Sequence, residues 1–188
     1  VTDRSGITGE KMELDGYLTV EGPAISTYNH QNKNFLCTMV VLNKEADAQV
    51  GKEVAMQIAA MNPIAVNEAG VPEEVKANEM QVAIEKTKME QVQKAVEAAL
   101  KKAGFNLYIA ENEEHLNEGV MKGNITEAQA QEIRDLKEKV AAEKAANLPA
   151  QMIENIAKGR MAKFFKENCL LNQEYIQDAK MTVADYLK

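Results

Sequence analysis

The sequence predicts an α+β protein in which a three-stranded antiparallel sheet is covered by helices and a long antiparallel coiled-coil helical hairpin is inserted. Residues 11–42 alternate apolar and polar side chains between turn residues, as strands with one buried face do. Apolar side chains then recur every seven residues through residues 73–102, a pattern that keeps one apolar stripe aligned along a helix. Capping and turn residues divide the remainder into further helices.

The sheet is expected to be a meander of three strands. The first strand alternates between residues 11 and 20, and Gly22 and Pro23 mark the turn that follows it. The second strand covers residues 24–28, and a polar loop separates it from the third, residues 35–42. The third strand is the most apolar, so we expect it to be the most buried.

A helix is expected to follow the sheet and to cover one of its faces. Asp47 offers an N-cap, and Asn62 with Pro63 stops the helix. Its alanines would let the backbone approach the sheet closely, so we interpret it as a packed core helix without chemistry. The apolar positions at helical spacing are Val50, Val54, Ile58 and Met61.

Two long helices are expected to form the inserted arm. The first covers residues 73–102 with Gly104 as its C-cap, and the second begins at a capping box of Thr126 and Gln129 and ends at Pro149. Two amphipathic helices joined by a polar connection fold back antiparallel to cover their apolar stripes. The heptad positions are Val75, Val82, Met89 and Val96, and the residues expected to cap the tip are Phe105, Leu107, Tyr108 and Ile109.

These elements divide the chain into three expected parts. Residues 1–72 hold the sheet and core helix, residues 73–148 form the coiled-coil arm, and residues 149–188 return to the core as C-terminal helices. Phe164, Phe165, Leu170 and Leu171 lie in the last part, and their spacing favours core positions over an interface.

The composition excludes several functional classes. With 45% apolar and 27% charged residues the chain is too apolar for intrinsic disorder. A net charge of −7 disfavours a nucleic-acid partner, which needs clustered Lys and Arg. No window approaches the roughly 20 apolar residues that cross a bilayer, and no signal-peptide pattern is present, so we expect a cytoplasmic protein without membrane contact. Cys37 and Cys169 are expected to be reduced core thiols.

The ionisable residues do not form a catalytic or metal-binding motif. His30 and His115 have no other ligand at metal spacing, and HExxH and CxxC signatures are missing. Gly51-Lys52-Glu53 lacks the other residues of a phosphate loop. We therefore expect no enzyme, cofactor or metal. His30 lies in a polar loop between strands, where it is either a partner contact or an exposed histidine without a role.

Several segments resemble bacterial translation elongation factor Ts. VAMQIAAMNP at residues 54–63 resembles the family's IAMHIAA..P helix, and GRMAKFF at 159–165 followed by CLLNQ at 169–173 resembles its EGR..KF..E..LL.Q.F signature. Residues 178–187 are similar to the family's C-terminal tail. Residues 15–43 resemble its preceding three-stranded segment, with Tyr28-Asn29-His30 in place of Tyr-x-His. The resemblance covers most of 11–72 and 149–188, and residues 90–145 do not align.

The resemblance implies a guanine-nucleotide exchange factor that binds elongation factor Tu, stabilises its nucleotide-free state and so promotes GDP release. It implies that Tyr28, Asn29 and His30 bind this partner. The family's N-terminal helical domain and its Thr-Asp-Phe segment are missing, so we expect the chain to be the C-terminal half of the core, the dimerisation region, cut from a longer factor. The alternatives are a structural coiled-coil or dimerisation module without exchange activity, with a homodimer possible, and, less well supported, a small-molecule enzyme.

Overall fold

The computed structural model describes residues 1–188, which form two compact units. Unit 1 comprises Val1–Val66 and Asn168–Lys188, and unit 2 comprises Asn67–Glu167. The protein is a mainly helical α+β structure with two small antiparallel sheets of two strands each. None of its helices combines the length and apolar character needed to span a bilayer.

Unit 1 contains both sheets and three α-helices. The β1–β2 hairpin precedes the long helix α2, and the short pair β3–β4 leads into the last helix, α8. The elements are α1 (Thr2–Thr8), β1 (Ala24–Asn29), the 3₁₀ turn η1 (His30–Asn32), β2 (Cys37–Leu42), α2 (Ala48–Met61), the 3₁₀ turn η3 (Leu170–Asn172), β3 (Glu174–Tyr175), β4 (Asp178–Thr182) and α8 (Val183–Tyr186).

The predicted three-strand meander is wrong in its first strand. β1 and β2 pair antiparallel from Ala24 opposite Leu42 to Asn29 opposite Cys37, and residues 11–21 form no strand. Tyr17 and Leu18 are 82% and 85% exposed. Alternation produces a strand only when one face can be buried, and here the side chains of the first segment find no surface to cover.

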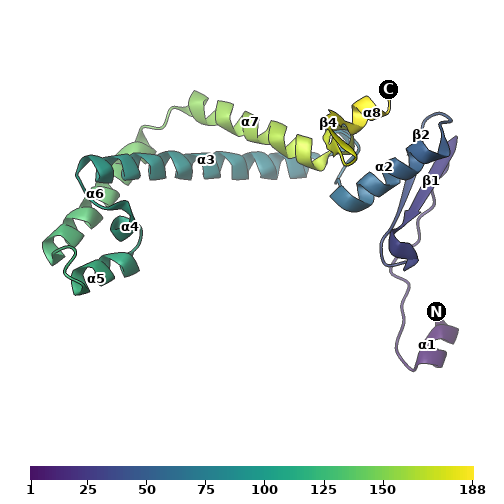
Figure 1. Ribbon diagram of the computed structural model, residues 1–188, viewed down its shortest axis with the longest axis horizontal. Helices are drawn as coiled ribbons and strands as arrows, with labels where there is room; N and C mark the ends of the chain where they lie inside the picture. Colours follow the sequence, from purple (N-terminus) through teal and green to yellow (C-terminus); the bar gives the residue numbers. More distant parts are fainter. The chain divides into compact units, whose positions relative to one another are not determined.

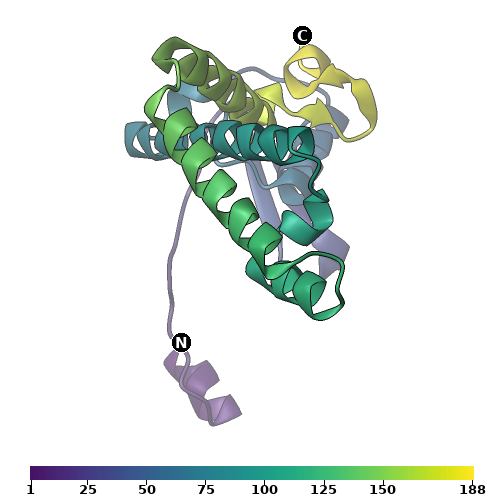
Figure 2. The same cartoon turned by 90° about the vertical axis from the view of Figure 1, so that its left-hand side faces the viewer.

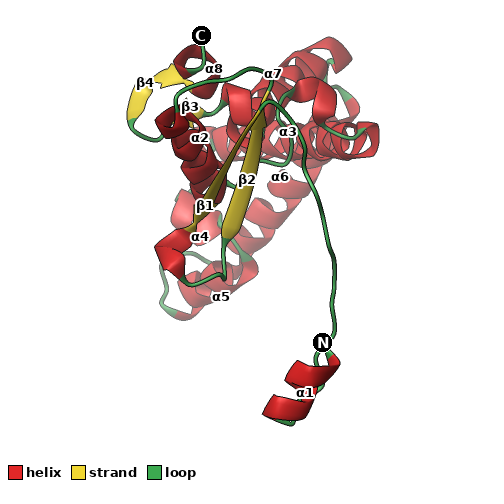
Figure 3. Ribbon diagram, turned by 90° about the vertical axis from the view of Figure 1, so that its right-hand side faces the viewer, coloured by secondary structure: helices red, strands yellow, loops and turns green.

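The predicted core helix is confirmed as α2, which packs on one face of the β1–β2 sheet (Figure 3). The Asp47 carboxylate accepts a hydrogen bond from the Gln49 amide at 2.8 Å and caps the helix. The Thr38 hydroxyl on β2 donates to the Ala55 carbonyl at 2.8 Å. A Cβ at Gly51 would collide with the Ser26 hydroxyl, so the close contact of helix and sheet requires glycine there.

The C-terminal segment returns to α2 and completes the core of unit 1. The Ile64 amide donates to the Asn168 carbonyl and the Leu170 amide to the Ala65 carbonyl, each at 2.9 Å. Leu170 and Val183 then pack with Val54 of α2 as the buried apolar cluster. The segments 64–66 and 168–171 therefore lie side by side, joined by backbone hydrogen bonds.

Unit 2 is entirely helical, and its long helices α3, α6 and α7 are packed together (Figure 1). The predicted helix over 73–102, the capping box at Thr126 and Gln129, and the helix after Pro149 are all confirmed. The elements are the 3₁₀ turn η2 (Glu68–Gly70), α3 (Glu73–Lys102), α4 (Leu107–Ala110), α5 (Glu113–Met121), α6 (Glu127–Ala146) and α7 (Ala150–Asn168).

The connection between the arm helices is more structured than the sequence predicted. Residues 105–123 fold into α4 and α5, each capped by an asparagine: Asn106 accepts from the Tyr108 amide at 2.9 Å and Asn112 from the His115 amide at 2.8 Å. α6 crosses α3 obliquely, and the two short helices fill the angle between them (Figure 2). The joint core is Val96, Leu100, Ala110, Leu116, Ala130 and Ile133.

The residues expected to cap the tip divide into two pairs. Phe105 and Ile109 pack against this core as predicted, whereas Leu107 and Tyr108 are 40% and 64% exposed. Two consecutive residues of a short helix point in different directions, so a run of apolar residues there cannot all face inward.

The heptad positions of α3 are only partly buried. Val96 is 5% exposed, but Val82 and Met89 are 48% and 72% exposed. The buried stripe instead contains Ala83 and Thr87, and the Thr87 hydroxyl is satisfied by donating to the Ala83 carbonyl at 2.6 Å. The sequence pattern favoured the larger apolar side chains, whereas close packing of the helix selects the small ones.

Candidate partner-binding site

The candidate residues Tyr28, Asn29 and His30 lie together where β1 ends and η1 begins. The Tyr28 hydroxyl shares a hydrogen bond with His30 Nδ1 at 2.9 Å, and the two rings meet edge to face with centroids 5.9 Å apart. The backbone amide of His30 donates to the Leu36 carbonyl at 2.9 Å. The tyrosine therefore orients an exposed imidazole at the end of the hairpin.

Asn29 braces the same turn through a second contact. Its side-chain amide donates to Asn34 Oδ1 at 2.5 Å, while its own Oδ1 accepts from the Asn34 backbone amide at 3.1 Å. Gln31, Asn32 and Asn34 all have positive φ, at 53°, 54° and 60°. Non-glycine residues in this region cost free energy, and a turn that keeps three of them is held in one shape by its surroundings.

An exposed phenylalanine that the sequence analysis did not select as a candidate also lies in this turn. Phe35 is 93% exposed, although the pattern assigned it to the most buried strand. β2 begins only at Cys37, so Phe35 belongs to the turn and not to the pleated segment. Exposed aromatic side chains beside oriented polar groups are typical of binding surfaces. We call Tyr28, Asn29, His30 and Phe35 the hairpin site.

The comparisons with known proteins agree with the resemblance seen in the sequence. The family described as Elongation factor TS matches residues 1–188. The chain belongs to the elongation factor Ts family.

Three relatives show how far the similarity extends. Elongation factor Ts of Bacteroides fragilis is 62% identical over 188 residues, which is 100% of this chain and 57% of the relative. That of Phocaeicola vulgatus is 64% identical with the same coverage, and that of Flavobacterium psychrophilum is 31% identical over 99% of this chain and 48% of the relative. The chain thus spans about half the length of the relatives it matches.

The elongation factor Ts motifs lie mostly in the interior. The helix motif is α2, and residues 169–173 form the turn that packs against it, which brings Val54 and Leu170 into one cluster. In the second motif Arg160 of α7 forms an ion pair with Glu90 of α3. Phe164 and Phe165 are half-buried with their rings edge to face at 5.6 Å. Motif residues of this family therefore identify the packing of the chain more directly than its binding surface.

The face of the β1–β2 sheet opposite α2 carries three partly exposed apolar side chains. Ile25 pairs with Val41, and Met39 lies on the same face two residues before Val41. Ile25 is 47% exposed, Val41 is 37% exposed and Met39 is 51% exposed. Cys37 is exposed on this strand, so the prediction of a core thiol is wrong there, while it is confirmed for Cys169, which is fully buried.

A polar network binds the C-terminal segment of unit 1 to α2. Buried Gln57 donates to Gln173 Oε1 at 3.3 Å and to the Glu174 carbonyl at 3.1 Å, and accepts from the Ile176 amide at 2.9 Å. Both the amide nitrogen and the amide oxygen of Gln57 thus hydrogen-bond to residues 173–176. We therefore assign Gln57 a structural role.

Glu53 extends this network with a carboxylate held by two tyrosines. The Tyr186 hydroxyl donates to Glu53 Oε2, and the Tyr175 hydroxyl donates to the same oxygen at 2.7 Å. The two rings stack with centroids 4.3 Å apart. Donation from Tyr186, then from Tyr175 and Gln49, lowers the pKa of Glu53 to about 2. A carboxylate saturated with donors is a weak base, so this cluster does not suit acid–base catalysis.

The two tyrosines show the reciprocal effect. Burial and the Glu53 carboxylate raise the pKa of Tyr175, and the hydrogen bond to Glu53 followed by burial raises the pKa of Tyr186. Elsewhere, no three His, Cys, Asp or Glu side chains among residues 1–188 are placed to hold a metal ion. His115 contacts the Tyr108 carbonyl at 2.9 Å and stacks on the Tyr108 ring.

Proposed function

We propose that the chain supplies part of a guanine-nucleotide exchange factor for elongation factor Tu and that the hairpin site contacts this partner. The observation that carries the proposal is a braced turn with an oriented imidazole and a nearly fully exposed phenylalanine, on a chain that belongs to the elongation factor Ts family. A factor of this family works in the cytoplasm, with the translation machinery.

Exchange of this kind requires differential binding and no covalent chemistry. The factor must bind the nucleotide-free GTPase more tightly than the GDP-bound form, and nucleotide must then weaken the complex by the same factor. A preformed turn suits this task because little conformational entropy is lost on binding. The Asn29–Asn34 brace and the Tyr28–His30 hydrogen bond provide such a turn.

The decisive experiment measures release of a fluorescent GDP analogue from elongation factor Tu in the presence of this chain. We expect faster release, and in a pull-down we expect binding that excess GDP weakens. Binding that is insensitive to GDP, with no acceleration of release, would contradict exchange activity.

The hairpin site is tested by substitutions with matched controls. His30→Ala and Phe35→Ala are each expected to weaken the complex by about tenfold or more, the loss typical of an interface anchor. Tyr17→Ala removes another exposed aromatic side chain of unit 1, 82% exposed, and is expected to leave the affinity unchanged. If the His30 and Phe35 variants bind like the Tyr17 variant, the hairpin is not the contact.

A second candidate function is a structural module in which the chain self-associates, with the paired helices as a coiled-coil arm. The partly exposed face of Ile25, Met39 and Val41 favours this candidate, because an apolar sheet face gains free energy when a second layer covers it. Light scattering should then give the mass of a dimer, and Met39→Asp should give a monomer. A monomer at all concentrations would exclude this candidate.

A further inference from the structure

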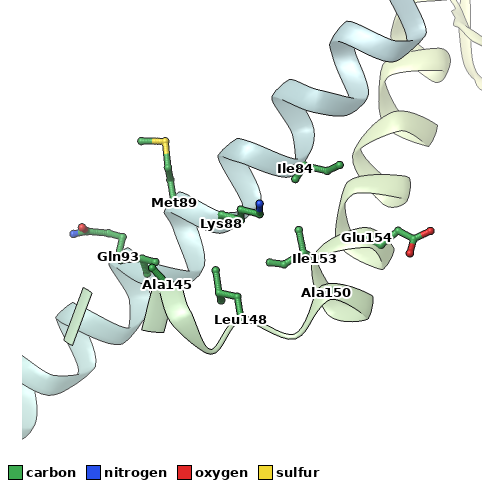
Figure 4. A pocket seen from close by; sticks show the side chains of 10 residues that line it. Ile84, Lys88, Met89, Gln93, Ala145, Leu148, Ala150, Ile153 and Glu154 are labelled. Carbon is green, nitrogen blue, oxygen red and sulfur yellow. The ribbon is translucent and has the colours of Figure 1, made fainter. Parts of the chain in front are cut away.

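Unit 2 contains a cavity of about 860 Å³ between α3, the end of α6 and the start of α7. Figure 4 shows it as the space between the α3 and α7 helices, with Leu148 of the α6–α7 connection beneath. Pockets that hold small ligands commonly measure about 300–1,000 Å³. We call this space the α3–α7 cavity.

The walls of the α3–α7 cavity are mainly apolar. Ile84 and Val92 come from α3, Leu148 from the connection and Ile153 from α7. Ile153 is only 4% exposed. The space is open to solvent, with Met89 and Gln93 exposed at its rim, so an apolar group that covers its walls gains free energy by removing them from water.

The space persists because long side chains, not close backbone contact, join α3 to α7. One joint is the ion pair between Arg160 of α7 and Glu90 of α3. The connection of Asn147, Leu148 and Pro149, which turns the chain from α6 into α7, is a second joint. Together the two joints keep the first half of α7 beside the cavity-lining part of α3.

The only charged group directed into the cavity is a cation. Figure 4 shows Lys88 reaching from α3 toward α7, whereas Glu154 points away from the space. Glu154 is paired with Lys158 at 2.7 Å, while Lys88 is exposed at the rim of the cavity and forms no ion pair with a carboxylate of the chain. A single unpaired ammonium beside apolar walls is complementary to a ligand with one anionic end and an apolar body.

We infer that the α3–α7 cavity binds an anionic amphiphile of the class of a medium-chain fatty acid. The carboxylate would pair with Lys88, and the hydrocarbon chain would lie against Ile84, Leu148 and Ile153. Burial of the chain provides the affinity, and the ammonium provides the preference for a carboxylate. This site is separate from the hairpin site and does not depend on nucleotide exchange.

Calorimetric titration of the whole chain with three ten-carbon probes below their micelle concentrations tests the inference. Decanoate should bind in a saturable way, and 1-decanol and decyltrimethylammonium should bind about tenfold more weakly or worse, since they cannot form the charged hydrogen bond. Lys88→Glu should weaken decanoate binding by at least the same factor. Lys94→Glu makes the same charge change elsewhere on α3 and should leave the affinity unchanged.

A space-filling variant provides an independent check. Ala145→Phe places a ring at the wall and should abolish decanoate binding while the helical circular dichroism is unchanged. Equal affinity for the three probes, non-saturable binding, or equal effects of the Lys88 and Lys94 variants would overturn the proposal. So would a dimer in light scattering that Ala145→Phe dissociates, because the occupant would then be a second copy of the chain.

Discussion

Each of the two units is stabilised internally by a different kind of contact. Unit 2 has an apolar core in which Leu116 and Ile133 are almost completely buried between α3, α4, α5 and α6. Unit 1 has only Val54, Leu170 and Val183 in its cluster, and fastens its C-terminal segment through Gln57, Gln173 and the Glu53 carboxylate. A small apolar cluster cannot fix a segment alone, whereas directional hydrogen bonds specify one arrangement.

The comparison shows that the two units should lose stability in different ways when a buried side chain is changed. An apolar core loses stability in proportion to the volume removed. A polar network fails when one member leaves its partners buried and unpaired. The following changes separate these two behaviours.

The largest effect is expected from Leu116→Ala in unit 2. Leu116 is fully buried, and such truncations cost about 2–5 kcal/mol in free energy of unfolding. Hydrogen exchange should show loss of protection in α5 and α6, with the amides of α2 unchanged. Leu116→Met keeps the volume and serves as the control, with an expected cost below about 1.5 kcal/mol. Equal losses in both variants would show that packing volume is not the cause.

A smaller but more local effect is expected from Gln57→Leu in unit 1. The variant keeps a side chain of similar size but removes the hydrogen bonds that Gln57 makes with the Gln173 side chain, the Glu174 carbonyl and the Ile176 amide. Only Gln173 of these three is buried, and water can replace the bonds lost by the exposed Glu174 and Ile176, so the expected cost is about 1–3 kcal/mol in all. Hydrogen exchange should accelerate from residue 174 to 182. Gln81→Leu on the exposed side of α3 is the control, and similar exchange in both variants would exclude the network as the fastening.

Lowering the pH should weaken the attachment of the β3–β4 segment to α2. The folded-state pKa of Glu53, about 2, is below its ordinary value of 4.5. The carboxylate therefore stabilises the fold at and above pH 4.5, and this contribution is lost as the pH falls from 4.5 toward 2. Glu53→Gln should remove this part of the pH dependence, as measured by exchange of the β3 and β4 amides. A variant that keeps the wild-type pH profile would assign it to other carboxyl groups.

The smallest effect is expected from Arg134→Ala on the surface of unit 2. Arg134 Nε is 3.0 Å from Glu113 and a terminal nitrogen is 3.5 Å from Glu127. Exposed pairs of this kind stabilise a fold only slightly and are screened by salt. Thermal unfolding should show a small loss at low salt that disappears at high salt. A loss that salt does not reduce would indicate a packing role of the arginine stem.

The sequence predicted helices better than strands for physical reasons. Helix ends are local, so Asp47, Thr126 with Gln129, and Pro149 could be recognised one residue at a time. The first predicted strand failed because a strand needs a partner elsewhere in the chain, which alternation cannot supply. The heptad in α3 failed at Val82 and Met89 because the pattern does not say which face the neighbouring helices cover.

The hairpin site was predictable only in part. Tyr28, Asn29 and His30 were selected by a resemblance to a family, and the structure adds the hydrogen bonds that shape the turn. Phe35 was missed because an apolar residue next to a strand is usually assigned to the core. The signal that could have indicated its exposure is the run of asparagines before it, since these residues favour turns with positive φ.

The backbone bridge between Ala65 and Cys169 has a consequence for how such chains change length. Residues 67–167 begin and end at adjacent points of unit 1. Backbone hydrogen bonds between residues 64–66 and 168–171 hold these two points together. The entropy of joining ends that are already close depends only weakly on the length of the chain between them. A change in the length of residues 67–167 therefore costs this closure little, which makes unit 2 the part of the chain where such changes are best tolerated.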